Sequence, residues 1–308
     1  MKPLDFLVIG AQKCATTALF EYLRGHPEVK MPLEKEVPFF SGDDYDDSAW
    51  RSFSSHHFND EDDLLWGKAS PQYLCDKHAP ERIKALMPKV KLIAILRDPI
   101  ERSWSHYQMG RRRETECRDF DTAVNELLQT SSLKKAAELP VPTHAMGHEP
   151  EGEFYLSWSE YGRLLQRYTQ LFDSSQILVL YTEDLKRDPA GTLDKVLEFI
   201  GLDAGYRPQQ LGEVIHRGGG SNRVPHKLRV WLRERSFIYR LWQWVPDDKQ
   251  GRLRFLYEQW NVRKEDAPVR RMSIETESRL QQHFAKDLEM LSELSGQSPP
   301  WIERFIPS

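Results

Sequence analysis

Short apolar segments stand out in the pattern of hydrophobic and polar positions along the chain. Three of them, Phe6–Ile9, Leu92–Leu96 and Ile177–Tyr181, are nearly continuous in Leu, Ile and Val. This pattern is typical of parallel strands that are covered on both faces, because such strands have no solvent-facing side. Leu65–Ala69 is predicted as a further short strand. The sequence therefore indicates a buried parallel β-sheet.

Helical patterns separate these strands. They cover Thr17–Arg24, Ala79–Leu86, Ile100–Arg112, Tyr161–Leu171 and Gly191–Ile200. Alternating strands and helices imply a doubly wound α/β fold. We therefore predict a three-layer, P-loop-like arrangement in which a central parallel β-sheet is flanked by helices.

Two regions depart from this alternation. Residues 111–158 contain one predicted helix, Phe120–Leu128, followed by several Pro, Gly and His residues, and we expect an insertion or lid there. From residue 224 onwards the chain is predicted to be helical and is rich in Arg and Trp. It ends in a helix predicted over Ser273–Leu294, with Ser273 as its N-cap. Residues 1–308 are interpreted as one domain.

Composition and charge narrow the function. The chain has 308 residues, of which 39% are hydrophobic and 29% are charged, as in a soluble globular protein. Its net charge of −4 does not favour a nucleic acid as partner. No apolar run approaches the roughly 20 residues that span a bilayer, and the N-terminus lacks the pattern of a signal peptide. Three scattered cysteines and unsuitably spaced histidines predict a cytoplasmic protein without a metal site.

The first candidate site is the loop that follows Phe6–Ile9. The apolar run stops at Gly10, and the loop carries Lys13 before Thr16 and Thr17 at a helix start. Backbone N–H groups and the helix dipole attract anions at such a junction. Lys13 follows the glycine too soon for the Gly-x-x-x-x-Gly-Lys-Ser/Thr loop of nucleotide hydrolases. The alternatives are a surface turn with an incidental lysine and, for Cys14, inert packing or a reactive thiol.

The second candidate site begins where the strand Leu92–Leu96 ends. Arg97 directly follows this strand, and Ser105 comes about two helical turns later. Ligands of open α/β sheets bind beyond the carboxyl ends of the strands, so Arg97 is placed to hold a phosphate with help from the Ser105 hydroxyl. The alternative is a surface ion pair between Arg97 and Asp98, which would contribute little.

Together these residues resemble the sulfotransferases that use 3′-phosphoadenosine 5′-phosphosulfate (PAPS), and most closely their heparan-sulfate-type and bacterial carbohydrate-type branch. The resemblance also rests on Lys-Glu-Val-Pro-Phe-Phe at 35–40, on the strand and helix at 177–185, on Asp-Pro at 188–189 and on Phe-Ile-Gly-Leu at 199–202. It runs over nearly the whole chain, and it implies transfer of a sulfuryl group to a hydroxyl without a metal.

The resemblance also implies a role for each matching residue. The family's second motif holds the 3′-phosphate, which points to Arg97 and Ser105. Its general base is the glutamate of the Lys-Glu-x-x-Phe-Phe motif, here Glu36. Its first loop wraps the 5′-phosphosulfate and a late glycine-rich loop closes over the nucleotide. The matching residues are Lys13, Cys14, Ala15, Thr16 and Thr17 in the first loop, and Gly219, Gly220, Ser221 and Arg223 in the late one.

The sequence departs from the family pattern at two places. Ala15 stands where the family commonly has glycine, which predicts a less open loop. Lys68 occupies the usual glutamate position before Ser-Pro, and Ala69 the position of the family's lysine. Because adjacent strand residues face opposite sides, Lys68 either serves catalysis or substrate binding or points away from the site.

We therefore predict a PAPS-dependent sulfotransferase in which Glu36 takes the hydroxyl proton and Lys13 neutralises charge on the leaving nucleotide. Two other classes stay open. A kinase or nucleotide hydrolase would need a later lysine and a magnesium-binding acid. A nucleotide-binding protein of the same fold without catalysis is compatible with Ala15 and Lys68.

The motifs do not identify the acceptor, because a sugar hydroxyl, a lipid and a carrier-bound β-hydroxyacyl chain all fit them. The stretch Lys227–Val245 interleaves arginines with aromatic residues. Such a stretch either binds an apolar acceptor or a membrane surface, or packs on the core. With a net charge of −4, we favour a small or partly apolar hydroxyl acceptor over a long polyanion, with carbohydrate as the alternative.

Overall fold

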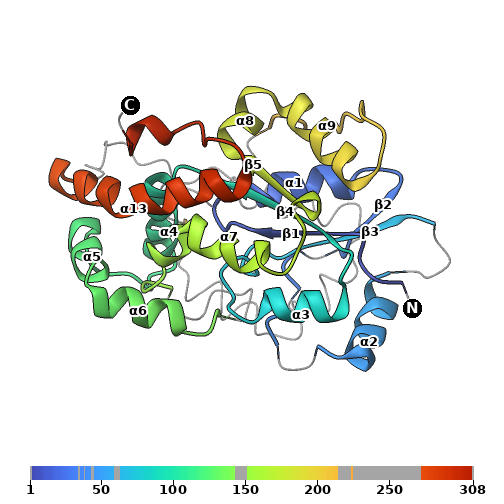
Figure 1. Ribbon diagram of the computed structural model, residues 1–308, viewed down its shortest axis with the longest axis horizontal. Coiled ribbons are helices and arrows are strands. Elements are labelled where there is room, and N and C mark those ends of the chain that lie inside the picture. Colours follow the sequence, from blue (N-terminus) through green and yellow to red (C-terminus); the bar gives the residue numbers. More distant parts are fainter. Residues whose placement is uncertain are drawn as a thin grey trace.

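A five-stranded sheet forms the centre of the computed structural model (Figure 1), which describes residues 2–33, 35–37, 39–42, 45–58, 63–142, 151–213, 223–224 and 272–306. The spatial order of the strands is β2-β3-β1-β4-β5, and every neighbouring pair is parallel. The strands are β1 (Phe6–Gly10), β2 (Val29–Lys30), β3 (Leu65–Ala69), β4 (Lys91–Leu96) and β5 (Ile177–Tyr181). The predicted parallel sheet is confirmed. The two-residue strand β2 is too short to leave an apolar pattern and was not predicted.

Two helical layers cover the sheet because its strands alternate their apolar side chains between the two faces. Phe6 and Val8 of β1 pack with α1 and α9, whereas Leu7 and Ile9 pack toward α3, α7 and α13. The helices of the first layer are α1 (Thr16–Arg24), α8 (Thr182–Arg187) and α9 (Pro189–Ile200). Those of the second are α3 (Ala79–Leu86), α7 (Tyr161–Thr169) and α13 (Ile274–Ser295). This arrangement is the predicted α/β architecture.

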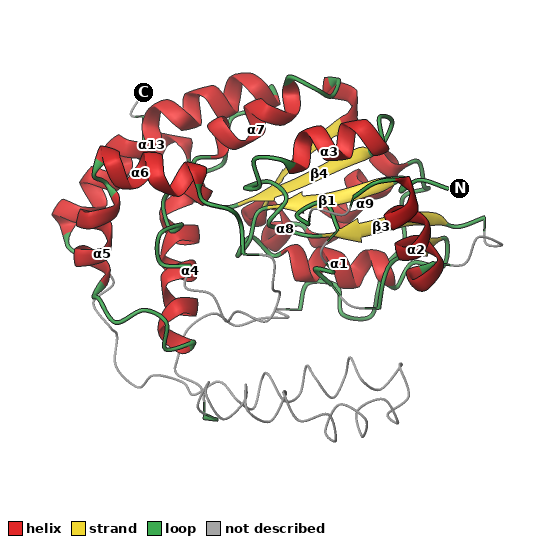
Figure 2. Cartoon of the chain, turned by 90° about the horizontal axis from the view of Figure 1, so that it is seen from below, coloured by secondary structure: helices red, strands yellow, loops and turns green. Residues whose placement is uncertain are grey.

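The helix α4 (Pro99–Arg112) leaves the sheet from the carboxyl end of β4. Its N-cap is Asp98, whose carboxylate accepts hydrogen bonds from the N–H groups of Ile100 (2.8 Å) and Glu101 (3.0 Å). Figure 2 shows α4 beside the sheet, with the helices α5 (Phe120–Leu127) and α6 (Thr130–Glu138) next to it. The expected 111–158 segment therefore carries a second helix. The apolar face of α5 joins the main core, while α6 buries only Ala136.

The remaining helix ends follow local sequence signals. Ser273 caps α13 as predicted, because its hydroxyl accepts the N–H of Thr276 at 3.1 Å. The helix α2 (Asp47–His57) was not predicted, since its residues are mostly polar and it buries Trp50 as its one large apolar side chain.

Among the described residues, no helix is long and apolar enough to cross a lipid bilayer. The residues 225–271, which include most of the predicted C-terminal helical region and all of Lys227–Val245, lie outside the described part of the chain.

Candidate active site

The loop between β1 and α1 lies at the carboxyl end of the central strand. The N–H of Ala11 donates to the carbonyl oxygen of Ile95 on β4 at 2.8 Å, which ties the loop to the neighbouring strand. Lys13 and Ala15 have left-handed backbone conformations, with φ of 73° and 61°. Ala15 is the N-cap of α1, and its methyl side chain cannot accept hydrogen bonds from the first helical turn. The start of α1, formed by Thr16 and Thr17, is therefore suited to an external anion.

Lys13 lies among other cations. Its Nζ atom is 3.9 Å from the Sδ atom of Met109 on α4. Burial, followed by Arg112 and Arg113, lowers the pKa of Lys13 to about 7, and Glu151 opposes this effect only in part. Several positive charges therefore converge on one side of the loop. An anion bound there would relieve their repulsion and raise the pKa of Lys13 again.

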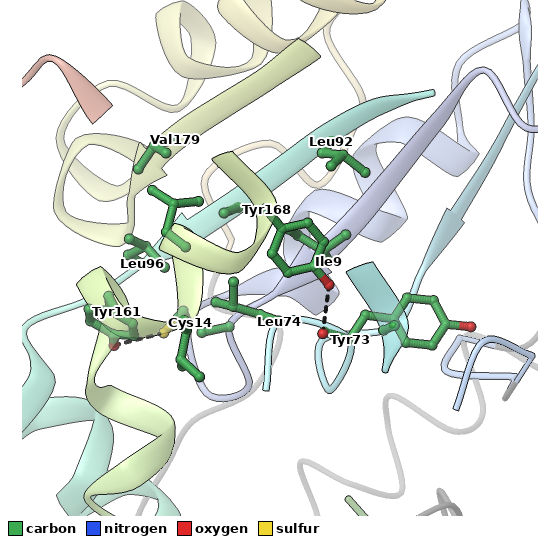
Figure 3. Close-up of a cluster of buried hydrophobic side chains, with 14 of the residues drawn as sticks. Ile9, Cys14, Tyr73, Leu74, Leu92, Leu96, Tyr161, Tyr168 and Val179 are labelled. Carbon is green, nitrogen blue, oxygen red and sulfur yellow. Dashed lines mark hydrogen bonds between the residues drawn. The ribbon is translucent and has the colours of Figure 1, made fainter. Parts of the chain in front are cut away.

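The side chain of Cys14 points into the core instead of the loop opening (Figure 3). Its Sγ atom is 3.7 Å from the hydroxyl of Tyr161 on α7. Burial raises the pKa of the Cys14 thiol to about 11, so the thiol stays protonated at neutral pH. The structure favours the packing interpretation of this side chain, and only the backbone of Cys14 remains for contact with a ligand.

Glu36 is fastened to the end of β3 by its own backbone. Its N–H donates to the carbonyl oxygen of Ala69 at 3.0 Å, and its φ of 68° turns the chain sharply at this residue. Burial acts to raise the pKa of Glu36, but Lys35, Gln72 and Lys13 outweigh it and the pKa is lowered. The carboxylate is therefore ionised at neutral pH and can accept a proton. Because β3 and β1 are parallel neighbours, the Glu36 segment and the loop that carries Lys13 lie at the same edge of the sheet.

Lys68 lies beneath the Glu36 segment and is 1% exposed. Its Nζ atom donates to the hydroxyl of Tyr73 at 2.8 Å and also contacts the Ser70 hydroxyl. The Tyr73 hydroxyl in turn accepts the N–H groups of Phe39 and Phe40, both at 3.2 Å. Burial lowers the pKa of Lys68, while the nearby Tyr73 and Glu36 act to raise it. Lys68 is thus oriented toward the Glu36 segment, and its direct contacts are hydroxyl groups of the protein.

The aromatic residues of the Glu36 segment are anchored in the core. Phe39 and Phe40 are 6% and 0% exposed, and their rings pack edge to face with centroids 4.9 Å apart. Phe40 also packs against Tyr73, with centroids 5.6 Å apart. This packing fixes the end of the segment that follows Glu36, and so it restricts the position of Glu36.

Arg97 follows β4 at the same edge of the sheet. Its Nη2 atom donates to the Glu101 carboxylate at 3.2 Å, which differs from the Asp98 pair considered from the sequence. Its Nε atom is buried and has no hydrogen-bond partner among the described groups. Buried donors are nearly always paired, so this orphaned donor fits an anionic ligand. Ser105 lies on the buried side of α4 and is 9% exposed.

The late loop is represented only by Arg223, which is exposed. Gly219, Gly220 and Ser221 lie outside the described residues. The structure therefore gives no position for the predicted closure over the nucleotide. Among the residues that are described, no cluster of His, Cys, Asp and Glu is suited to hold a metal ion.

The site also contains a buried polar network that was not predicted from the sequence. Arg102 of α4 and Glu151 contact Gln12 of the β1–α1 loop, and His106 of α4 lies between Arg102 and Glu151 and contacts both. The only local signal is the spacing of Arg102 and His106, which places both side chains on one helix face. Their partners lie far away in sequence, so the network exists only in the folded chain.

Comparison with known proteins identifies the family. Residues 3–217 match the family model of the sulfotransferase domain. The chain therefore belongs to the sulfotransferase family. The fold agrees with the crystal structure of a sulfotransferase from Alicyclobacillus acidocaldarius, with a TM-score of 0.65 at 20% identity, covering 99% of this chain and 100% of that one.

Two curated relatives illustrate the range of similar proteins. The human heparan sulfate glucosamine 3-O-sulfotransferase 6 is 28% identical over 273 residues, covering 79% of this chain and 72% of the relative. The mouse bifunctional heparan sulfate N-deacetylase/N-sulfotransferase 4 is 32% identical over 208 residues, covering 65% of this chain. The chain spans only 22% of the length of that larger protein.

Proposed function

We propose that this sulfotransferase uses PAPS as donor and an acceptor hydroxyl as nucleophile. The observation that carries the proposal is the backbone hydrogen bond that fixes Glu36 at the carboxyl end of β3, beside the end of β1 from which the loop with Lys13 leaves. One group is suited to accept a proton, and the other to balance charge on a leaving phosphate. PAPS supplies the sulfuryl group, whose transfer depends on positioning and electrostatics as phosphoryl transfer does.

The residues around the loop are assigned to the two ends of the donor. Lys13, Thr16, Thr17 and the backbone at Cys14 and Ala15 hold the 5′-phosphosulfate. Arg97 and Ser105 hold the 3′-phosphate, supported by the orphaned Nε atom of Arg97. The late loop at 219–223 completes the nucleotide site.

The reaction follows from these positions. Glu36 accepts the proton of the acceptor hydroxyl as that oxygen forms its new bond to sulfur. The bond between sulfur and the bridging oxygen of the phosphosulfate breaks, and Lys13 stabilises the charge left on that oxygen. Lys68 is assigned to the support of Glu36, because its Nζ atom reaches Tyr73 and Ser70.

The acceptor is proposed to be a small or partly apolar hydroxyl compound, with carbohydrate as the alternative. The names of both relatives contain heparan sulfate, which supports a carbohydrate acceptor, and the 3-O-sulfotransferase name of the human relative supports a hydroxyl as the accepting group. The net charge of −4 argues against a long polyanion, since such a substrate is better matched by a basic protein. A lipid or carrier-bound β-hydroxyacyl acceptor is the second candidate, because the motifs place no restriction on the carbon skeleton.

The experiment is sulfate transfer from radiolabelled PAPS to three acceptors: a heparosan-type polysaccharide, a hydroxylated lipid and a β-hydroxyacyl carrier protein. Each is measured at low and high salt. We expect turnover with at least one of them and stabilisation of the protein by adenosine 3′,5′-bisphosphate. If ATP with magnesium stabilised the protein as much as adenosine 3′,5′-bisphosphate does, the donor assignment would be contradicted. Saturable, salt-sensitive turnover on the polysaccharide alone would contradict the preference for a small or partly apolar acceptor.

A further inference from the structure

A buried arginine links α4 to the β1–α1 loop. Arg102 is 0% exposed, and its Nε atom donates to the carbonyl oxygen of Gln12 at 3.1 Å. Its Nη1 atom donates to the carbonyl oxygen of Tyr155 at 3.1 Å and to the Ser159 hydroxyl at 3.3 Å. One guanidinium therefore joins the loop, the helix and the 155–159 segment, and its planar set of donors fixes their relative orientation.

His106 lies one helical turn beyond Arg102 and continues the network. Its Nδ1 atom is 3.0 Å from Nη2 of Arg102, and its Nε2 atom is 2.5 Å from Oε2 of Glu151. A guanidinium can only donate, so Nδ1 of His106 must accept and the ring proton lies on Nε2. Burial and Arg102 lower the pKa of His106 to about 4, in agreement with this neutral tautomer. Trp158 stacks on the ring, with centroids 5.3 Å apart, and holds its orientation.

Gln12 is held by this network through both its backbone and its side chain. Besides the bond to its carbonyl oxygen, its Oε1 atom accepts from Arg102 at 3.5 Å, and its Nε2 atom donates to Glu151 at 3.2 Å. Glu151 also receives Arg113 at 3.4 Å, so its carboxylate balances cations that surround Lys13. Donors and acceptors are matched at every position, which specifies one orientation of Gln12.

The orientation of Gln12 determines where the next amide points. The peptide bond between Gln12 and Lys13 is trans, and in a trans peptide the C=O and N–H bonds point in opposite directions. Because the Gln12 carbonyl faces Arg102, the N–H of Lys13 faces away from the network. This is the orientation that an anion-binding loop needs, since its amides must point at the ligand.

We propose that Arg102, His106 and Glu151 form a positioning network that sets the affinity of the β1–α1 loop for the 5′-phosphosulfate end of the donor. The inference rests on the proposed function, because it assumes that this end of the nucleotide binds at Lys13. Within the residues that the structure describes, no hydrogen bond joins the side chains of this network to those of Arg97 or Ser105, so its effect is directed to one end of the ligand.

The test compares two substitutions of one residue. His106→Gln keeps an acceptor toward Arg102 and a donor toward Glu151, whereas His106→Leu removes both. Binding of adenosine 3′,5′-bisphosphate and adenosine 3′-monophosphate is measured by calorimetry, since only the former carries a 5′-phosphate. We expect His106→Leu to lower the affinity for the bisphosphate about tenfold, because net hydrogen-bond contributions are of this order. The affinity for the monophosphate should be unchanged. His106→Gln should retain most of the affinity.

The outcomes separate the two hypotheses. If the wild-type protein binds both nucleotides equally, the proposed placement of the 5′ end fails. Suppose that the wild-type protein prefers the bisphosphate. If His106→Leu then weakens the binding of both nucleotides equally, or of neither, the proposal of a positioning network is contradicted. Gln12→Leu provides a second variant with the same expectation should His106→Leu not fold, because it removes only the side-chain contacts of the loop residue.

Discussion

The backbone N–H of Glu36 donates to the carbonyl oxygen of Ala69, the last residue of β3, at 3.0 Å. This bond attaches the segment that carries the proposed base to the end of a buried strand. Lys68, the preceding strand residue, supports the same segment from below through Tyr73. The base is therefore positioned by the sheet itself, which explains how a residue in an irregular segment can be held for catalysis.

Glu36→Gln tests the base directly. The amide keeps the shape of the side chain and cannot accept the proton, so turnover should fall by about 10²–10⁴-fold while nucleotide affinity stays constant. Transfer kinetics and calorimetry measure the two quantities. Glu198→Gln, an exposed position on α9, is the matched control and should behave as wild type. Near-normal turnover of Glu36→Gln at saturating acceptor would place the base elsewhere.

The pKa of Lys13, lowered to about 7 by burial and neighbouring arginines, predicts a pH-dependent affinity. The ammonium is present below this pKa and is lost above it, so binding of adenosine 3′,5′-bisphosphate should weaken as the pH rises beyond 7. Phosphate ionisation does not explain such a trend, because its second pKa is about 6. Lys13→Arg should remove the dependence, since a guanidinium stays charged. Calorimetry across this range would contradict the assignment if wild-type affinity were constant.

Ala15→Gly should stabilise the protein. Ala15 has a φ of 61°, a left-handed conformation that costs a residue with a Cβ atom about 1 kcal/mol and glycine much less. We expect the free energy of unfolding to rise by up to about this amount. Ala18→Gly, within the same helix, should lower it by about 1 kcal/mol. In denaturant titrations, the two variants should change the free energy of unfolding in opposite directions if the loop conformation is correct.

Tyr73→Phe should separate the support of Glu36 from nucleotide binding. The hydroxyl accepts two backbone N–H groups and Lys68. Its removal leaves the two backbone donors unpaired, at a cost of about 1–3 kcal/mol each, while Lys68 keeps its contact with the Ser70 hydroxyl. We expect a lower melting temperature and a lower turnover number, with unchanged affinity for adenosine 3′,5′-bisphosphate. Unchanged turnover would show that the position of Glu36 does not depend on this junction.

Arg97→Ala tests the other end of the donor. Its buried Nε atom has no partner in the described part of the chain, and loss of a buried charge partner typically costs about 2–5 kcal/mol. Binding of adenosine 3′,5′-bisphosphate should weaken by this order, and binding of adenosine 5′-phosphosulfate, which lacks the 3′-phosphate, should weaken far less. Equal losses for the two ligands would assign Arg97 to the fold or to another group.

Local patterns in the sequence determined the sheet and the main candidate residues. The strands β1, β4 and β5 are continuous apolar runs because both of their faces are covered. Such runs can be recognised directly in the sequence. Arg97 was found because it directly follows β4, and Lys13 because it lies in the short loop after β1. Chain order alone places both at one edge of a parallel sheet. The cap of α13 by Ser273 is equally local.

Tertiary structure decided the contacts between residues that are distant in the chain. The orientation of Lys68 depends on Tyr73 and on the return of the Glu36 segment, whereas strand alternation left it undetermined. In the network of Arg102, His106 and Glu151, only the spacing of the first two residues is visible in the sequence, since Glu151 lies on a different segment. Hydrogen bonds and charge interactions act over a few ångströms in space irrespective of sequence separation, so their partners are specified only when packing of the core brings the segments together.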